Sequence, residues 1–198
     1  MKFRVFLVGL LLAVSTTSVF AAGPYIGAAG GVSIIHDSDL NEPGFQTVTG
    51  SYDTGYGFNL NGGYNFDGFR LEGEFGYKSS ELESVTASGI TFNTISNDAT
   101  IMSFMVNGLY DIKTQSMVTP YLGAGLGLIN GELKANGIEK DDTVFGYQLI
   151  AGVGFAINKN VTLDVSYRFQ GAASDLNIDG TDVSYMSSNI YGGIRYNF

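Results

Sequence analysis

The feature that most constrains this chain is an alternation of apolar with small or polar side chains, repeated in eight segments of about ten residues. A two-residue period is typical of β-strands with two different faces, whereas an amphipathic helix repeats every three or four residues. In segment 55–66 one face is aromatic or aliphatic at nearly every position, and the other consists of glycine and asparagine. The sequence therefore predicts an all-β chain with eight strands.

The connections between the expected strands alternate in length. The strands are 25–35, 55–66, 69–78, 100–112, 121–129, 143–157, 161–170 and 183–198. The short connections are 67–68, 113–120 and 158–160, and the long ones are 36–54, 79–98, 130–142 and 171–182. This layout is typical of outer-membrane barrels. We therefore expect an eight-stranded antiparallel up-and-down transmembrane β-barrel with short periplasmic turns and long extracellular loops.

The two strand faces decide between a membrane barrel and a soluble barrel such as a lipocalin. An eight-stranded barrel leaves an interior only wide enough for side chains to fill. It has no room for so many inward Phe, Tyr and Leu side chains, so we expect the apolar face to point outward into lipid and the glycine-rich face to line the lumen. The expected interfacial aromatics are Tyr56, Phe66, Phe69, Tyr77, Tyr110, Phe145, Tyr196 and Phe198.

Residues 1–21 have the organisation of a secretory signal peptide. Lys2 and Arg4 give a positive start, a short apolar run follows, and a small-x-small cleavage pattern ends at Ala21. An uncleaved N-terminal anchor is the alternative, although the run is shorter than the roughly 20 residues that a spanning helix needs. We expect cleavage after Ala21, which leaves 22–198 as the outer-membrane β-barrel domain.

Composition excludes several classes of protein and site. The chain has no cysteine and one histidine, which excludes a disulfide scaffold, a lipoprotein anchor, a thiol nucleophile and a thiolate or His-rich metal site. Its net charge is −9, and loss of the leader leaves eight basic residues against 19 acidic ones. Nucleic-acid-binding proteins are usually basic. We therefore expect no nucleic acid, metal or cofactor.

Several strand segments resemble motifs of one family. They are 63–74, 119–127, 147–154, 163–169 and 192–198. The first reads Gly-Tyr-x-Phe-x-x-x-Arg-x-Glu-x-Glu, and the second contains Pro-Tyr-x-Gly-x-Gly-x-Gly. They resemble the opacity/surface-antigen family of eight-stranded outer-membrane β-barrels. The resemblance covers most of the strands and none of the long loops, and it implies an outer-membrane surface antigen or adhesin among lipid and lipopolysaccharide.

The C-terminal segment has apolar or aromatic residues at alternate positions: Ile194, Tyr196 and Phe198. A terminal Phe with this spacing resembles the signal that the barrel-assembly machinery reads. The resemblance therefore implies that this machinery is a partner, and that the loops face host surface ligands.

Seven charged residues fall on the expected lumen face. They are Arg70, Glu72, Glu74, Lys78, Asp164, Arg168 and Arg195. A charge in a narrow lumen of low dielectric constant is costly unless it is paired, and Arg forks suit carboxylates. We expect an internal salt-bridge network that plugs the barrel, with a gated pore or proton path as the alternative.

The expected long loops hold 14 of the 19 acidic residues. These are Asp37, Asp39, Glu42, Asp53, Glu81, Glu83, Asp98, Glu132, Glu139, Asp141, Asp142, Asp175, Asp179 and Asp182. In these loops only Lys134 and Lys140 oppose them. A hydrophilic cell surface explains such loops, and capture of divalent cations or of basic host surfaces is the functional alternative.

His36 and Ser38 lie near the expected outer membrane face, where some barrels hydrolyse or acylate lipid A. A nucleophilic serine needs a base that is itself oriented by a third group, and one histidine before a loop serine is weak support. We therefore expect a surface protein that is not an enzyme. A small-solute porin is the first alternative and a lipid A-modifying enzyme the second.

Overall fold

The computed structural model describes residues 22–198 apart from 37, 42–47, 53, 88–89, 94–97, 136–137, 175 and 179–180. The predicted signal peptide lies outside the described residues. So do five of the loop acids, which are Asp37, Glu42, Asp53, Asp175 and Asp179.

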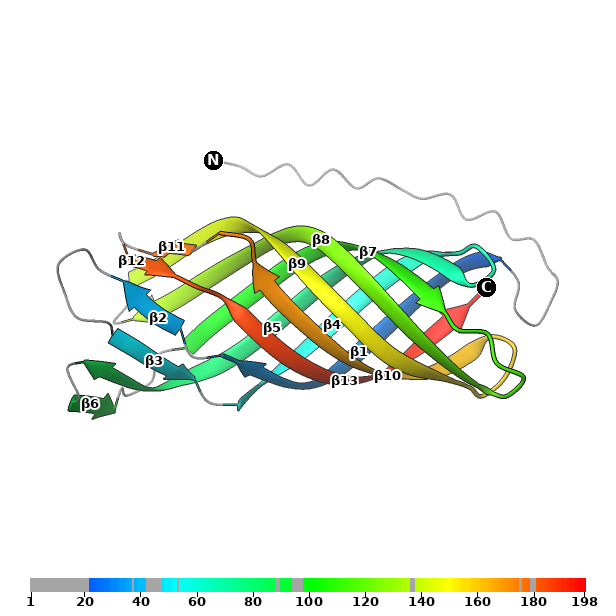
Figure 1. Cartoon of the computed structure of the whole chain (residues 1–198), viewed down its shortest axis with the longest axis horizontal. Helices are drawn as coiled ribbons and strands as arrows, with labels where there is room; N and C mark the ends of the chain where they lie inside the picture. The colour runs from blue at the N-terminus through cyan, green and yellow to red at the C-terminus, as the bar shows by residue number, and fades with distance from the viewer. Residues whose placement is uncertain are drawn as a thin grey trace.

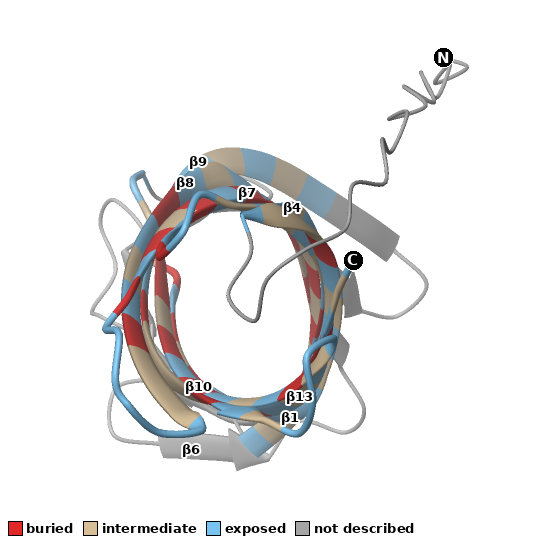
Figure 2. Ribbon diagram, turned by 90° about the vertical axis from the view of Figure 1, so that its right-hand side faces the viewer, coloured by how far each residue is buried: buried red, intermediate tan, exposed pale blue. Residues whose placement is uncertain are grey.

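Eight strands form a closed antiparallel barrel (Figures 1 and 2). They are β1 (Gly23–Ile35), β4 (Thr54–Asn65), β5 (Phe69–Ala87), β7 (Asp98–Asp111), β8 (Val118–Ala135), β9 (Ile138–Ala156), β10 (Val161–Ala172) and β13 (Met186–Asn197). Each pairs with its neighbour in this order, and β13 closes the ring on β1. The predicted fold class is confirmed. Among the described residues, no helix is long and apolar enough to cross a membrane.

Three short connections gather at one end of the barrel, called here the turn end. Between β4 and β5, Asp67 and Gly68 both have positive φ, 62° and 112°. That pair of φ values is typical of a two-residue hairpin turn whose twist matches the strands. The connection 157–160 turns where the Asn158 side chain accepts from two backbone N–H groups. The C-terminus lies at this end too (Figure 1).

The outer wall is apolar over a band and then becomes polar toward the opposite end, called here the loop end. Over much of the described parts of the barrel strands, more buried residues alternate with more exposed ones (Figure 2). The predicted girdle aromatics are exposed, except for the partly buried Tyr77. Outward positions become polar on seven strands or at their ends, at His36, Thr54, Ser79, Thr100, Asn130, Thr143 and Ser188. The outward apolar residues from Met102 on β7 to Ile112 just after it cover about 33 Å of strand. A tilt of about 40° reduces this length to about 25 Å along the barrel axis, which matches an apolar band of about 25 Å.

Further strands continue past this boundary, where long loops were predicted. They are β2 (Ser38–Asn41), β3 (Val48–Tyr52), β6 (Ile90–Asn93), β11 (Leu176–Ile178) and β12 (Thr181–Val183). Their pairing runs β11–β12–β2–β3–β5, and β6 pairs with β5. The prediction of a loop over 130–142 was wrong, because β8 and β9 stay paired up to Ala135 and Ile138. Here neither face meets lipid, so no two-residue pattern marks the strands.

The lumen holds two apolar clusters that the sequence analysis did not identify. One, the loop-end cluster, consists of Ile35, Ile101, Ile129 and Tyr185, with Val144 and Ala172 against it. The other consists of Leu109, Tyr121 and Ile150. The inward face of β7 carries Ile101, Met105 and Leu109 between Ser103, Asn107 and Asp111, so its apolar members do not stand out in the sequence. The polar network occupies the lumen between and around these clusters.

Candidate functional site

The lumen network is the candidate site, and strand geometry explains its composition. Arg70, Glu72, Glu74 and Lys78 occupy alternate positions of β5, so they share the inward face and are buried. Asp164 and Arg168 come from β10, and Arg195 from β13; Asp164 is partly buried and the other two are buried. All seven predicted residues therefore lie in the lumen.

An eighth charged residue, Asp111 on β7, was not predicted and is 8% exposed. Asp111 is two and four positions from the inward Leu109 and Asn107, so the two-residue period of the strand could have identified it as inward. With Asp111 the lumen network contains four acidic and four basic side chains.

Toward the turn end, two arginines pair with carboxylates from adjacent strands. Arg70 Nη2 lies 2.9 Å from Asp111 Oδ1, and Arg70 Nε donates to the same oxygen at 3.0 Å. The Arg70 guanidinium also lies 4.6 Å from the ring centre of Tyr121, within cation–π range. Arg195 Nε lies 3.6 Å from Asp164 Oδ2, too far for a direct hydrogen bond.

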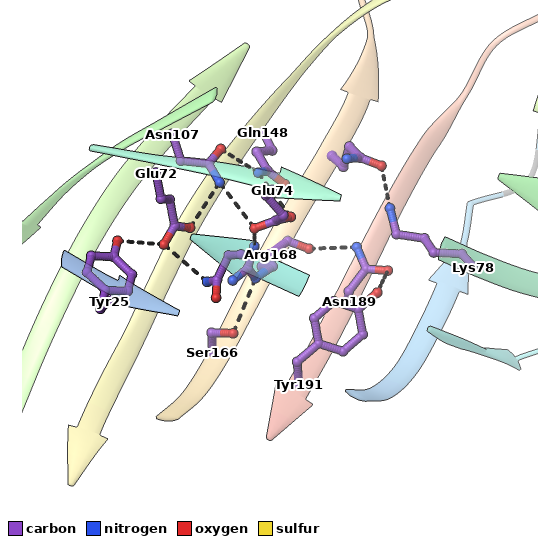
Figure 3. A network of polar contacts seen from close by, with 12 residues as sticks. Tyr25, Glu72, Glu74, Lys78, Asn107, Gln148, Ser166, Arg168, Asn189 and Tyr191 are labelled. Atoms are coloured by element: carbon purple, nitrogen blue, oxygen red, sulfur yellow. Dashed lines mark hydrogen bonds and ion pairs between the residues drawn. The ribbon is translucent and has the colours of Figure 1, made fainter. Parts of the chain in front are cut away.

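The middle of the network is built around two carboxylates (Figure 3). Glu72 accepts from three neutral donors: the Tyr25 hydroxyl at 2.8 Å, and Asn61 Nδ2 and Asn107 Nδ2 at 3.1 Å. Glu74 forms an ion pair with Arg168 and accepts from Asn107 Nδ2 at 3.1 Å. Gln148 Nε2 in turn donates to Asn107 Oδ1 at 2.6 Å. The amides thus connect the two carboxylates into one fixed arrangement.

Toward the loop end, Lys78 is held by neutral groups. Its ammonium donates to Gln170 Oε1 and, at 3.1 Å, to the Tyr185 hydroxyl. Tyr185 also donates to Gln170 at 3.1 Å and lies 2.9 Å from Ser187 Oγ. Its ring belongs to the loop-end cluster, so one side chain joins the polar network to the apolar layer at this end.

Lumen glycines provide the space that the network fills. A Cβ atom at Gly125 would overlap the side-chain oxygen of Asn107, and one at Gly152 would overlap the ring of Tyr121. Two cavities inside the lumen have volumes of about 20 Å³ and 10 Å³. Each has room for about one water molecule. The lumen is filled by side chains at these levels.

The fold has counterparts among known proteins. The family model described as "Outer membrane protein beta-barrel domain" matches residues 5–198. The chain belongs to this family. As an outer-membrane barrel, it has its turn end in the periplasm and its loop end outside the cell.

Individual relatives of this outer-membrane barrel are distant. Outer membrane protein PagN of Salmonella typhimurium strain LT2 is 26% identical over 202 residues, covering 86% of this chain and 83% of that protein. A candidate adhesin of Rickettsia conorii, RC1281, is 27% identical over 125 residues, covering 52% of this chain and 50% of that protein.

Two solved structures share the fold. Neisserial surface protein A has a TM-score of 0.65 at 22% identity, with 89% of this chain and 98% of that chain covered. OprG of Pseudomonas aeruginosa also has a TM-score of 0.65, at 16% identity, with 89% and 97% covered. At these identities, the two similarities show a shared barrel fold and nothing further.

The outer wall of the barrel carries the remaining candidate residues. His36 Nε2 lies 2.9 Å from Ser188 Oγ, which lies 2.9 Å from the Tyr167 hydroxyl. The described partner of His36 is thus Ser188 on β13, and the third group in the row is a phenol. No group of three or more His, Cys, Asp or Glu residues in the described part of the chain could hold a metal ion. The side chains of His36, Ser188 and Tyr167 thus lie within hydrogen-bond distance of one another in sequence along the outer wall, at the membrane boundary.

The three residues of the C-terminal motif face outward. Ile194, Tyr196 and Phe198 are about half exposed, and the rings of Tyr196 and Phe198 meet edge to face at 5.1 Å. They lie at the periplasmic end, where Ile194 and Tyr196 belong to the strand pair β1–β13 that closes the barrel and Phe198 follows it.

Proposed function

We propose that this outer-membrane barrel is a closed anchor that presents an acidic extracellular β-structure to positively charged partners, in the manner of an adhesin. The observation that carries the proposal is the continued strand pairing beyond the apolar band. Paired backbone holds acidic positions in a fixed arrangement, which a loose loop would not do. The name of the Rickettsia relative, a candidate adhesin, supports an adhesin-like function.

The register of these strands favours binding over simple solubility. Glu81 lies opposite Asp98, and Glu132 lies opposite Asp141. Like charges directly opposite each other across a strand pair destabilise the sheet. Lys134, placed opposite both Asp98 and Glu139, interrupts this row of acids. An acidic surface of this kind attracts basic partners and repels polyanions.

The filled lumen argues against the porin alternative. The cavities that the described residues form at the levels of Arg195 and Lys78 are water-sized and too small for a hydrated solute, and the loop-end cluster lies beyond them. We further propose export by cleavage after Ala21 and insertion through recognition of Phe198. The support for both is the sequence pattern and membership of an outer-membrane family.

A variant in which four of these acidic side chains are replaced by amides tests the proposal. The substitutions Glu81→Gln, Asp98→Asn, Glu132→Gln and Asp141→Asn remove four negative charges and keep the size and polarity of each side chain, so we expect the barrel still to fold. Purified protein in nanodiscs of zwitterionic lipid is applied to poly-lysine and to heparin surfaces. We expect salt-sensitive capture by poly-lysine that the variant loses, and no capture by heparin.

Asp67→Asn is the matched control, because it removes a negative charge at the periplasmic end. It should bind poly-lysine like the wild type. Equal binding by the four-site variant, or stronger capture by heparin, would refute the acidic-surface proposal.

A further inference from the structure

Asn59 is the most unusual polar side chain in the lumen. It projects inward from β4 and is 1% exposed, yet neither its amide nitrogen nor its amide oxygen has a hydrogen-bond partner among the described residues. Buried amide groups in proteins are almost always hydrogen-bonded, to protein or to ordered water. Asn59 lines both of the small lumen cavities, one on each side. We propose that the lumen binds two ordered water molecules, one on either side of Asn59.

The first site is the cavity of about 20 Å³ toward the periplasm. Besides Asn59, its lining includes other atoms without hydrogen-bond partners: Asn61 Oδ1, Asp164 Oδ1, and Nε and Nη1 of Arg195. The 3.6 Å separation between Arg195 and Asp164 is too long for a direct hydrogen bond and suits a bridge through water. One water molecule can accept from the guanidinium and donate to the carboxylate and amide oxygens.

The mixture of donors and acceptors selects water over an ion. An anion at this site would face the carboxylates of Asp164 and Glu72, which line the same cavity. A cation would face the guanidinium groups of Arg70 and Arg195. Water both donates and accepts, so it satisfies both kinds of group, and the volume matches about one molecule.

The second site is the cavity of about 10 Å³ on the extracellular side of Asn59. Lys78 and Ser103 line it together with Asn59. The Lys78 ammonium carries three hydrogens for its two described acceptors, Gln170 and Tyr185. The third hydrogen can serve a water molecule that also contacts the Asn59 amide. The Asn59 amide has one donating and one accepting end, so it joins the two sites.

The two waters complete the polar network and make the lumen hydrated but closed. The loop-end cluster of Ile35, Ile101, Ile129 and Tyr185 lies on the extracellular side and offers water no polar partner except the Tyr185 hydroxyl. Asp164 and Arg195, at the other end, remain partly exposed, at 17% and 11% of their side-chain areas. Water therefore enters from the periplasm. This inference is independent of what the extracellular strands bind.

High-resolution crystallography of the wild-type protein tests the proposal directly, with separate crystals soaked in bromide and in rubidium. We expect one water peak in each cavity, with at least three polar partners at the first site, and no anomalous peak from either ion. Asn59→Leu should remove both waters, whereas Asn130→Leu, at the outer membrane boundary, should leave them in place.

If Asn59→Leu does not fold, Asn59→Asp is tested in its place. Its carboxylate keeps an acceptor oxygen at this position, so the variant should keep the first water. Empty cavities in a map that resolves surface waters, or a bromide or rubidium peak at either site, would overturn the proposal.

Discussion

Glu74 on β5 and Arg168 on β10 form an ion pair across the full width of the barrel. In the ring of eight strands, β5 and β10 are four strands apart in either direction, so the two residues project from opposite walls. Both side chains are nearly fully buried, at 3% and 7% exposed. The pair therefore joins the two sides of the lumen, and the amides of Asn107 and Gln148 hold its carboxylate in place.

Removing one partner of this pair should destabilise the barrel strongly. Glu74→Gln leaves the Arg168 charge buried without its partner, and we expect a loss of about 3–5 kcal/mol in the free energy of unfolding. The double change Glu74→Leu with Arg168→Leu should cost less than the single change, because no unpaired charge remains. Urea unfolding in lipid vesicles, followed by circular dichroism, measures both.

The exposed pair between Asp67 and Lys113 is the control for that experiment. Its side chains are about 60% exposed, at 62% and 61%. Lys113→Ala should therefore change stability by about 0–1 kcal/mol. If Glu74→Gln proved as mild as Lys113→Ala, the pair across the lumen would contribute little to stability.

Tyr185 should control access to the lumen from outside the cell. Ser103, 2% exposed and on the wall of the second cavity, can be changed to cysteine in a chain with no other cysteine. We expect this thiol to resist externally added methanethiosulfonate reagents, and to react much faster when Tyr185→Gly is added. Tyr56→Gly, on the lipid face, should have no such effect. Equal reactivity with and without Tyr185 would show that another layer seals the barrel.

Enlargement should destabilise the barrel at an inward glycine and have little effect at an outward one. Gly125→Val places methyl groups where Asn107 already lies, and overpacking of this kind typically costs about 1–3 kcal/mol. Gly192→Val points into open space on the lipid face, where no atom of the described residues lies within 4 Å of the added Cβ. Folded fractions measured by heat-dependent gel mobility should fall for the first and hold for the second. A reversed order would contradict the assignment of faces.

Phe198 should matter for assembly in cells more than for stability. Its ring is half exposed and contacts Tyr196, so Phe198→Ala removes little packing. We expect the variant to refold in detergent like the wild type, yet to reach the outer membrane in smaller amounts when expressed in a bacterium. Loss of refolding in detergent would instead assign Phe198 a structural role. Ile157→Ala, also outward at the periplasmic end, provides the comparison.

The sequence by itself determined which face of each strand meets lipid and where the periplasmic turns lie. The reason is the two-residue period, because a shift of one position would move every Phe, Leu and Tyr of a strand into a lumen too narrow to hold them. The same two-residue period placed the seven predicted charged residues on the lumen face. The strands beyond the membrane were missed, since water on both faces removes the pattern that marks a strand.

Only the tertiary structure decided which of these residues touch. Closure of β1 on β13 determines that β5 faces β10, and hence that Glu74 meets Arg168 and Lys78 meets Gln170. No local spacing encodes a contact between residues 94 positions apart. The burial of Tyr185 and the unpartnered amide of Asn59 likewise depend on how side chains from several strands share one narrow space.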